Sequence, residues 1–412
     1  MDGEQRMICL TNGAVMPMDG REFSFSGTVL IAGERIRALA AHPPLAADAG
    51  REDLALVLGL GAEDLSPQLT VIDCAGRYVL PGFIDAHCHV GLGEEIFQYE
   101  GDDINEMTDP LTPELRAIDG VNPEDPAFRD ARRGGVTALF VCPGSANLIG
   151  GTGAVLKTVG RTVDEMIVRD PAGLKAALGE NPKTVYGDQK KSPSTRMGAA
   201  ALLRQAFVDA HTYRDKLRHG QEDPDKLPER DLGLEHLLLV LEKKIPLRMH
   251  AHRADDIMTA LRLAREFDLD LVLEHCTDGH KIADILAAAG VPAVVGPALI
   301  NRSKPEVKDK SLRTPGLLAA AGVQVALMTD HGVTPVEHLA LCAALAVKNG
   351  MPWAGALKAL TADAARILGV EARIGSLAPG KDADIVVWRG EPLSLSAEAE
   401  TVFINGRDVT DD

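Results

Sequence analysis

The chain has 412 residues, of which 45% are hydrophobic and 25% charged, and its formal net charge is −17 at pH 7. These values indicate a globular core, and the negative charge argues against binding to nucleic acids or to anionic membranes. The length suits two or three domains, although a single α/β barrel could account for most of it.

No segment has the pattern of a targeting signal or a membrane span. The start, MDGEQRMICLTNG, has no basic stretch followed by an apolar one, and no uncharged apolar run reaches roughly 18 residues. The six cysteines are scattered without a CxxC pair, which is typical of reduced thiols. We therefore expect a cytoplasmic protein that does not bind a membrane.

Both ends of the chain are rich in predicted strands. Residues 1–80 contain MICLTNGAVM, GTVLIAGERIRALA and LTVIDCAGRYVL, and Gly33 and Glu34 form the turn of a predicted hairpin. Residues 371–412 contain DADIVVW and FINGRDV, the second with a turn at Asn405–Gly406. We expect residues 1–80 and 371–412 to form one small β-sandwich domain.

Residues 81–370 alternate apolar, strand-like runs with helix-like segments, which is typical of βα units around a parallel sheet. After the first strand, which ends in PGFIDAHCHV, the predicted strands are 136–142, 174–180, 245–251, 271–275, 291–296 and 323–329. The predicted helices include 254–267, 281–290 and 335–348. This segment has about the usual size of a (β/α)8 TIM barrel, so we expect that α/β fold, although glycine-rich sequence obscures the third and fourth strands.

Histidines and an aspartate end four of these strands. Because side chains alternate along a strand, the two histidines of a His-x-His pair share a face. The carboxyl ends of barrel strands converge on one mouth, where imidazoles and carboxylates can hold a divalent metal ion. The residues concerned are His87 and His89, His250 and His252, His275, and Asp330 with His331.

The sequence resembles the metal-dependent amidohydrolase superfamily over nearly its whole length, and it is most similar to the imidazolonepropionase-related branch. The matching segments are VIDCAGRYVLPGFIDAHCHVG, MHAH, LEHC, MTDHGVTP and TADAARILGVEARIGSLAPGKDADIVVW. The resemblance implies that His87, His89, His250 and His275 bind the metal, His275 as part of the catalytic centre. It also implies that Asp330 touches the metal and acts as general base.

In this superfamily a glutamate or a carboxylated lysine from the third or fourth strand commonly completes the site. Three residues of this chain are candidates: Glu180, Lys175 and Lys157. We favour Glu180, because it stands where the predicted strand gives way to Asn181–Pro182, whereas Lys175 would lie toward the bottom of the barrel.

The residue types suit zinc, manganese or iron(II); we expect zinc, as one or two ions. A bound divalent ion lowers the pKa of water from near 16 to about 7, and Asp330 could pass the proton of that water to a departing nitrogen. The resemblance therefore predicts an enzyme that hydrolyses a C–N bond of an amide or cyclic amide in a small-molecule substrate. The alternatives are an amidine deaminase of a heterocycle and a barrel protein without catalysis.

One position departs from the related enzymes. Imidazolonepropionases and many deaminases carry an acid three residues after the strand-five histidine, and this chain has Arg253 there. That departure disfavours both activities. We expect His252, Arg253 and His331 to bind substrate; Arg253 could hold a carboxylate or instead form a surface salt bridge with Asp255 or Asp256.

Two loops near the predicted mouth stand out. The acidic segment GEEIFQYEGDDINEMTDPLTPELRAIDGVNPEDP is long for a βα loop, so we expect a lid or a contact in a homo-oligomer. The segment PGSANLIGGTG predicts a glycine-rich turn, with an anion-binding nest as the alternative.

Overall fold

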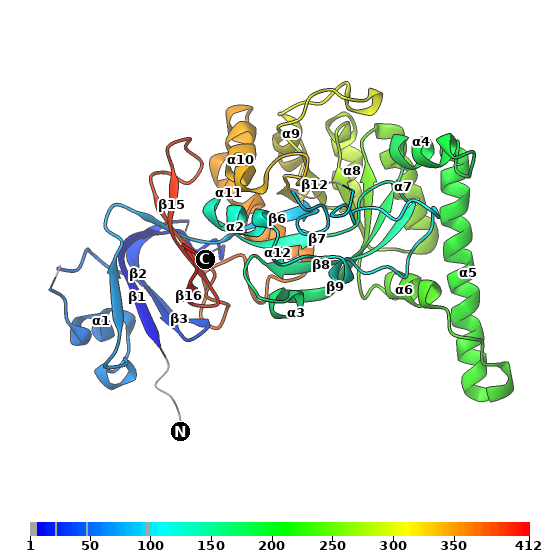
Figure 1. Ribbon diagram of the computed structural model, residues 1–412. Helices are drawn as coiled ribbons and strands as arrows, with labels where there is room; N and C mark the ends of the chain where they lie inside the picture. The colour runs from blue at the N-terminus through cyan, green and yellow to red at the C-terminus, as the bar shows by residue number, and fades with distance from the viewer. Residues whose placement is uncertain (1–5, 21–22, 47, 96–98) are drawn as a thin grey trace.

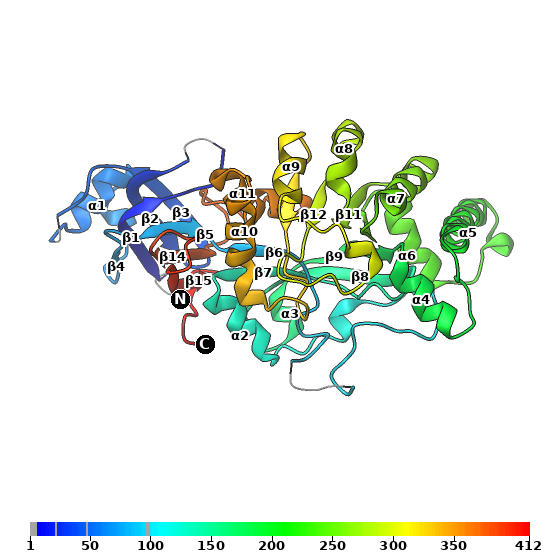
Figure 2. The same cartoon turned by 90° about the horizontal axis from the view of Figure 1, so that it is seen from above.

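The computed structural model describes residues 6–20, 23–46, 48–95 and 99–412. Within them the strands form two eight-stranded sheets. Figures 1 and 2 show the sheet that contains both ends of the chain on one side of the molecule and the larger α/β unit on the other. No helix in this part of the chain is both long enough and apolar enough to cross a membrane.

The terminal sheet joins strands from both ends of the chain, in the order β16–β15–β14–β5–β1–β2–β3 with β4 paired to β1. The strands are β1 (Met7–Val15), β2 (Phe25–Ala32), β3 (Arg35–Ala41), β4 (Thr70–Asp73), β5 (Tyr78–Pro81), β14 (Ile385–Arg389), β15 (Glu398–Ile404) and β16 (Arg407–Asp408). β14 lies antiparallel to β5, with Val386 opposite Leu80. The expected β unit built from both termini is therefore confirmed, and its two predicted hairpin turns connect β2 to β3 and β15 to β16.

The second sheet is a nearly closed barrel whose strands follow chain order. They are β6 (Phe83–Cys88), β7 (Val136–Val141), β8 (Ile149–Lys157), β9 (Ile167–Ala177), β10 (Leu247–Ala251), β11 (Leu271–His275), β12 (Ala293–Val295) and β13 (Val325–Leu327). The first and last strands meet where the Asp85 carboxylate accepts hydrogen bonds from the backbone N–H (3.2 Å) and hydroxyl of Thr329. The expected barrel is confirmed.

The barrel is mostly parallel, but β8 runs antiparallel to both β7 and β9. Only residues 142–148 connect β7 to β8, and a parallel crossover needs a dozen residues or more. The glycine-rich segment that we expected to be a turn therefore divides into this short connection and the start of β8 at Ile149.

The principal helices are α1 (Arg51–Leu58), α2 (Pro126–Arg133), α3 (Val163–Met166), α4 (Glu180–Asp188), α5 (Arg196–Glu222), α6 (Leu232–Leu241), α7 (Ala254–Phe267), α8 (Ala283–Ala289), α9 (Thr314–Ala320), α10 (Leu339–Lys348), α11 (Trp353–Ala359) and α12 (Ala362–Leu368). The predicted helix 254–267 is confirmed as α7. The other two predicted helices each begin with a short 3-10 turn, before α8 and before α10.

The acidic segment after β6 includes residues 96–98, which lie outside the described part of the chain, so its role as a lid stays a prediction. Its later residues run beside β8, with bridges from Leu111 to Ile149 and from Arg116 to Thr152.

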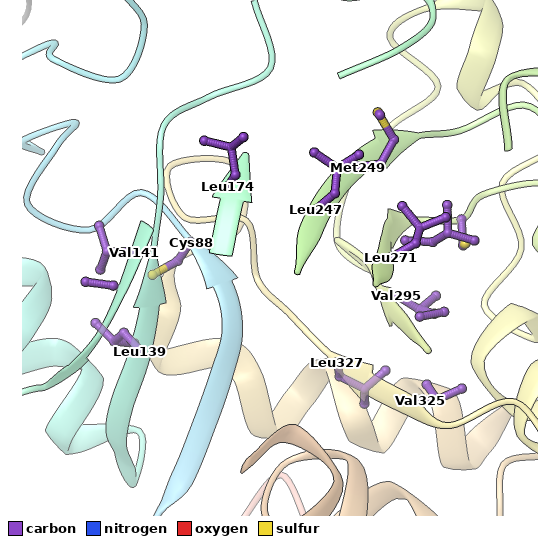
Figure 3. Close-up of a cluster of buried hydrophobic side chains, with 14 of the residues drawn as sticks. Cys88, Leu139, Val141, Leu174, Leu247, Met249, Leu271, Val295, Val325 and Leu327 are labelled. Atoms are coloured by element: carbon purple, nitrogen blue, oxygen red, sulfur yellow. The ribbon is translucent and has the colours of Figure 1, made fainter. Parts of the chain in front are cut away.

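Side chains of the barrel strands alternate between a core and the interior of the barrel. Leu247 and Met249 of β10 belong to the buried apolar cluster that Figure 3 shows. Between them, Arg248 donates to the carbonyl of Ala86 across the barrel (2.8 Å) and lies over the ring of Phe140 (3.9 Å). The two-residue period thus places Arg248 and, two residues later, His250 on the interior face.

Candidate metal centre

The strand-end residues predicted from the sequence meet inside the mouth of the barrel. Nε2 of His87 and Nε2 of His89 each lie 3.3 Å from Oδ1 of Asp330. The ring centroids of His250 and His275 are 4.3 Å apart, and those of His87 and His275 are 5.5 Å apart. Four separate strand ends therefore deliver their polar groups to one small buried volume.

The ligand atoms of these residues are close enough to share a metal ion. Three groups have ligand atoms within 4.8 Å of one another: His87, His275 and Asp330; His250, His252 and His275; and His87, His89 and Cys142. Both ring nitrogens of buried His250 lack a hydrogen-bond partner among the described residues, which is costly unless a ligand satisfies them. Imidazole and carboxylate donors fit a divalent transition metal.

Left-handed backbone conformations accompany the inward direction of His275 and Asp330. Glu274 and His275 are neighbours on β11, so strand alternation alone would send them to opposite faces. His275 and Cys276 have φ values of +69° and +50°, and Asp330 has φ of +56°. These left-handed conformations are uncommon for residues other than glycine, and such strain tends to occur at functional sites.

The electrostatic surroundings favour the metal-binding forms of His250, His275 and Asp330, whereas Cys142 and Glu274, against the effect of burial, hold the pKa of His87 well above its usual range. Burial, together with the neighbouring imidazoles, holds the pKa values of His250 and His275 well below the usual range, so both rings are neutral at pH 7. Burial alone would raise the pKa of Asp330, but its close contacts with His87 and His89 hold it well below its usual range. Neutral imidazole and ionised carboxylate are the forms that bind metal ions.

Glu274 contacts the ring nitrogen of His87 that does not face Asp330. Nδ1 of His87 lies 2.7 Å from Oε2 of Glu274, and Oε1 accepts from Nε of Arg248 at 2.8 Å. All three side chains are fully buried. Burial alone would raise the pKa of Glu274, but His87 and Arg248 hold it well below its usual range, so the carboxylate is charged.

His252 and His331 lie at the edge of the cluster. Nδ1 of His252 lies 2.8 Å from Oγ1 of Thr277, and burial, together with the charge of Lys304, lowers the pKa of His252 to about 4. Nδ1 of His331 accepts from the backbone N–H of Val336 at 3.1 Å. Both rings are buried, and His331 borders a surface hollow that also contains Glu94 and Glu95.

The structure does not bring Arg253 or Glu180 to the cluster. Arg253 makes two 2.8 Å hydrogen bonds to the Asp255 carboxylate on the surface. β9 ends at Ala177, and Gly179 breaks the strand with φ of +99°. Glu180 consequently begins α4, where its backbone N–H donates to Oε2 of Glu306.

The two lysine candidates occupy different places. Nζ of Lys157 lies 3.0 Å from Asp382 and also contacts Asp384, within a buried cluster between the barrel and the terminal sheet. Nζ of Lys175 lies 3.7 Å from Oε2 of Glu274, the oxygen that contacts His87. Lys175 also donates to the carbonyl of Pro143 at 3.1 Å.

Three polar residues beyond the predicted ligands adjoin the cluster: Glu274, Cys142 and Glu306. Cys142 follows β7 and its Sγ lies 3.7 Å from Nδ1 of His87. Oε1 of Glu306 lies 3.7 Å from Nε2 of His252. A lone acid in the apolar run LVLEH was a sequence signal for Glu274, whereas Glu306 lies in a short 3-10 turn between β12 and α9, where the sequence offers no pattern.

Comparisons with known proteins agree with this arrangement. The model of the Amidohydrolase family matches residues 78–409. Amidohydrolase tasK of Hapsidospora irregularis is 30% identical over 381 residues, which are 85% of this chain but only 38% of tasK. The imidazolonepropionase of Mesorhizobium japonicum is 26% identical over 386 residues, 85% of this chain and 87% of that protein.

A solved structure of an amidohydrolase from Thermotoga maritima MSB8 is similar over nearly the whole chain. It has a TM-score of 0.89 and 44% sequence identity, and the alignment covers 98% of this chain and 99% of the other.

Proposed function

The chain belongs to the amidohydrolase family, and on that premise we propose that it hydrolyses an amide or cyclic amide bond with Asp330 as general base. The observation that carries this proposal is the position of the Asp330 carboxylate, 3.3 Å from Nε2 of both His87 and His89. An ionised carboxylate beside imidazole ligands can take a proton from a water molecule held among them.

We propose that His87, His89, His250, His275 and Asp330 hold a divalent cation, with zinc as first choice and manganese or iron(II) as alternatives. The overlapping groups of ligand atoms support one or two ions. When bound, the cation supplies electrostatic activation of water and of the carbonyl under attack. Asp330 accepts a proton from the attacking water and passes it to the departing nitrogen, which leaves as an amine.

We infer that Lys175, rather than Glu180 or Lys157, completes the ligand set. Lys175 is buried on β9, and its amine approaches the carboxylate that contacts His87. A lysine amine that adds carbon dioxide releases a proton and gains a carboxylate, which would be an oxygen donor of the kind these metals accept. The Glu180 carboxylate accepts from the backbone N–H of Glu306, and Lys157 pairs with Asp382 outside the cluster.

We propose that His252 and His331 contact the substrate at the mouth of the barrel. The hydroxyl of Thr277 pairs with Nδ1 of His252 and therefore does not occupy Nε2. For Arg253, a role in substrate binding would require its guanidinium to leave Asp255.

We propose that residues 81–370 form the catalytic domain and that residues 1–80 with 371–412 form the β domain. All six cysteines are free and buried, which supports a reducing compartment such as the cytoplasm. We also propose a homo-oligomer in which the acidic segment after β6 contacts a second subunit.

A substrate screen with metal analysis tests the proposed function. Purified protein loaded with zinc should release an amine from at least one member of a panel of N-acyl amino acids, dipeptides and lactams. A chelator should abolish that activity, and added zinc should restore it. Release of ammonia from amino-substituted heterocycles, with no hydrolysis of the panel, would instead support the deaminase alternative.

A further inference from the structure

An apolar cavity lies directly beside the candidate metal centre. Its walls come from the end of β12, the segment that follows it, β13 and α10, and they include the rings of His252 and His275. The empty volume is about 580 Å³, part of which is open to solvent. Because the imidazoles of His252 and His275 also form its wall, a group in this cavity would lie against the histidine cluster.

Most of the wall is hydrocarbon. Its apolar side chains include Val295, Ile300, Val307, Leu312, Leu327 and Ala346. Pockets of this composition bind apolar parts of small molecules, while a few polar groups at one end fix the orientation. Here the polar end is the histidine cluster.

The polar side chains in the wall are largely engaged with the protein itself. Oγ1 of Thr277 pairs with His252, and Oγ1 of Thr314 lies 3.1 Å from Nδ1 of His280. Nζ of Lys310 donates to the carbonyls of Ala298 and Ile300. These engagements leave little hydrogen-bonding capacity for a polar substrate group.

The thiol of Cys342, which also lies in the wall, is neutral. Burial raises the pKa of the Cys342 thiol to about 12, so it carries no charge at pH 7. A free cysteine in this state behaves as a small apolar side chain. The cavity therefore has the chemistry of a hydrophobic core that is partly open to solvent.

We propose that this cavity is the specificity subsite of the enzyme and that it receives an aliphatic side chain carried next to the bond that is hydrolysed. This inference rests on the proposed function and narrows its substrate class to amides of apolar amino acids or their analogues. Burying each additional methylene should raise kcat/KM about fourfold until the cavity is full.

The first experiment measures kcat/KM for N-acetyl amino acids and dipeptides that differ only in one side chain: glycine, alanine, valine, leucine, aspartate and lysine. We expect a rise from glycine to leucine and poor turnover of the charged members. Equal turnover of all members would overturn the proposal. So would a preference for aspartate, because it would indicate that Lys310 binds an acidic group there.

Two variants with opposite effects on the cavity sharpen this test. Ala346→Leu should fill the cavity and abolish the advantage of leucine over alanine, whereas Leu312→Ala should extend the preference to larger side chains. Leu317→Ala, on α9 and 38% exposed, does not line the cavity and should leave the profile unchanged. An unchanged profile in both cavity variants, each folded by circular dichroism, would contradict the proposal.

A binding measurement separates failure of this inference from failure of the proposed function. Leucine hydroxamate and glycine hydroxamate carry the same metal-binding group and differ only in the side chain. With zinc-loaded protein, calorimetry should give at least about tenfold tighter binding of leucine hydroxamate, and Ala346→Leu should remove the difference. If no amide is hydrolysed but this difference is present, the proposed reaction fails and the subsite stands; equal affinities overturn the subsite.

Discussion

The Nδ1 atom of His87 lies 2.7 Å from Oε2 of Glu274, and both side chains are fully buried. The contact fixes which nitrogen of the ring faces the cluster, because Nδ1 lies against the carboxylate and Nε2 faces Asp330. Arg248 holds the other oxygen of Glu274. The orientation of a predicted metal ligand thus depends on a charged network in the barrel interior.

The first prediction concerns this network. Glu274→Gln should weaken metal binding by about 10- to 100-fold, because the fixed orientation and the negative charge behind His87 are lost. Competition with a chromogenic chelator measures the dissociation constant. Glu266→Gln, in a surface pair with Arg204, is the matched control and should bind metal like the parent protein. Equal metal affinity in both variants would show that Glu274 does not support His87.

The second prediction concerns the general base. Asp330→Asn should lower kcat by about 10²- to 10⁴-fold, because the amide cannot accept a proton from water. The circular dichroism spectrum should be retained. A variant with near-normal kcat would remove Asp330 from the role of base, whatever its part in metal binding.

The third prediction separates the two buried lysines. Lys157→Met should lower stability by about 3–5 kcal/mol, because it leaves buried Asp384 without its counter-charge, although Asp382 keeps Arg35 and Arg373, while the metal content stays unchanged. Lys175→Met should lower the metal content. Metal analysis after gel filtration measures the metal content, and urea unfolding measures the stability.

A carbon dioxide dependence adds to this test. If Lys175 is carboxylated, zinc reconstitution of the parent protein should improve with bicarbonate, and Lys175→Met should show no such improvement. Full metal content in Lys175→Met would return the choice to the other candidates.

The fourth prediction concerns Arg253. Its guanidinium pairs with Asp255, and both side chains are about half exposed. An exposed ion pair of this kind contributes about 0–1 kcal/mol, so Arg253→Ala should leave stability and KM nearly unchanged. A large rise in KM without a change in kcat would instead show that Arg253 binds the substrate.

The fifth prediction follows from the buried thiols. Burial raises the pKa values of Cys9, Cys74, Cys276 and Cys342 to about 12. At pH 8, well below these values, the thiols are protonated and so react poorly. Ellman's reagent should therefore label them slowly in native protein and all six cysteines quickly in guanidinium chloride. Fast labelling of four or more thiols in native protein would contradict their burial.

Much of this arrangement could be predicted from the sequence because it follows from strand alternation. His87 with His89, and His250 with His252, share a face through the two-residue period, and a barrel brings the strand ends together. The terminal sheet was predictable for a similar reason, since its hairpins have clear turn residues such as Asn405–Gly406.

Other features depend on contacts that no local pattern encodes. The antiparallel direction of β8 follows from a short connection whose boundaries glycine-rich sequence conceals. The sequence places Glu180 at the end of a strand. In the structure, Gly179 has a left-handed φ and the strand ends before it, which leaves Lys175 nearer the cluster. Glu306 approaches His252 from a distant loop, a contact that only the tertiary structure reveals.

Anomalous diffraction at the zinc edge, from crystals of zinc-saturated protein, shows whether these side chains hold a metal ion. We expect one or two strong peaks about 2.0–2.2 Å from ring nitrogens of His87, His89, His250 or His275 and from the Asp330 carboxylate. Saturated crystals with no anomalous peak among these side chains, or with peaks only elsewhere, would contradict this expectation.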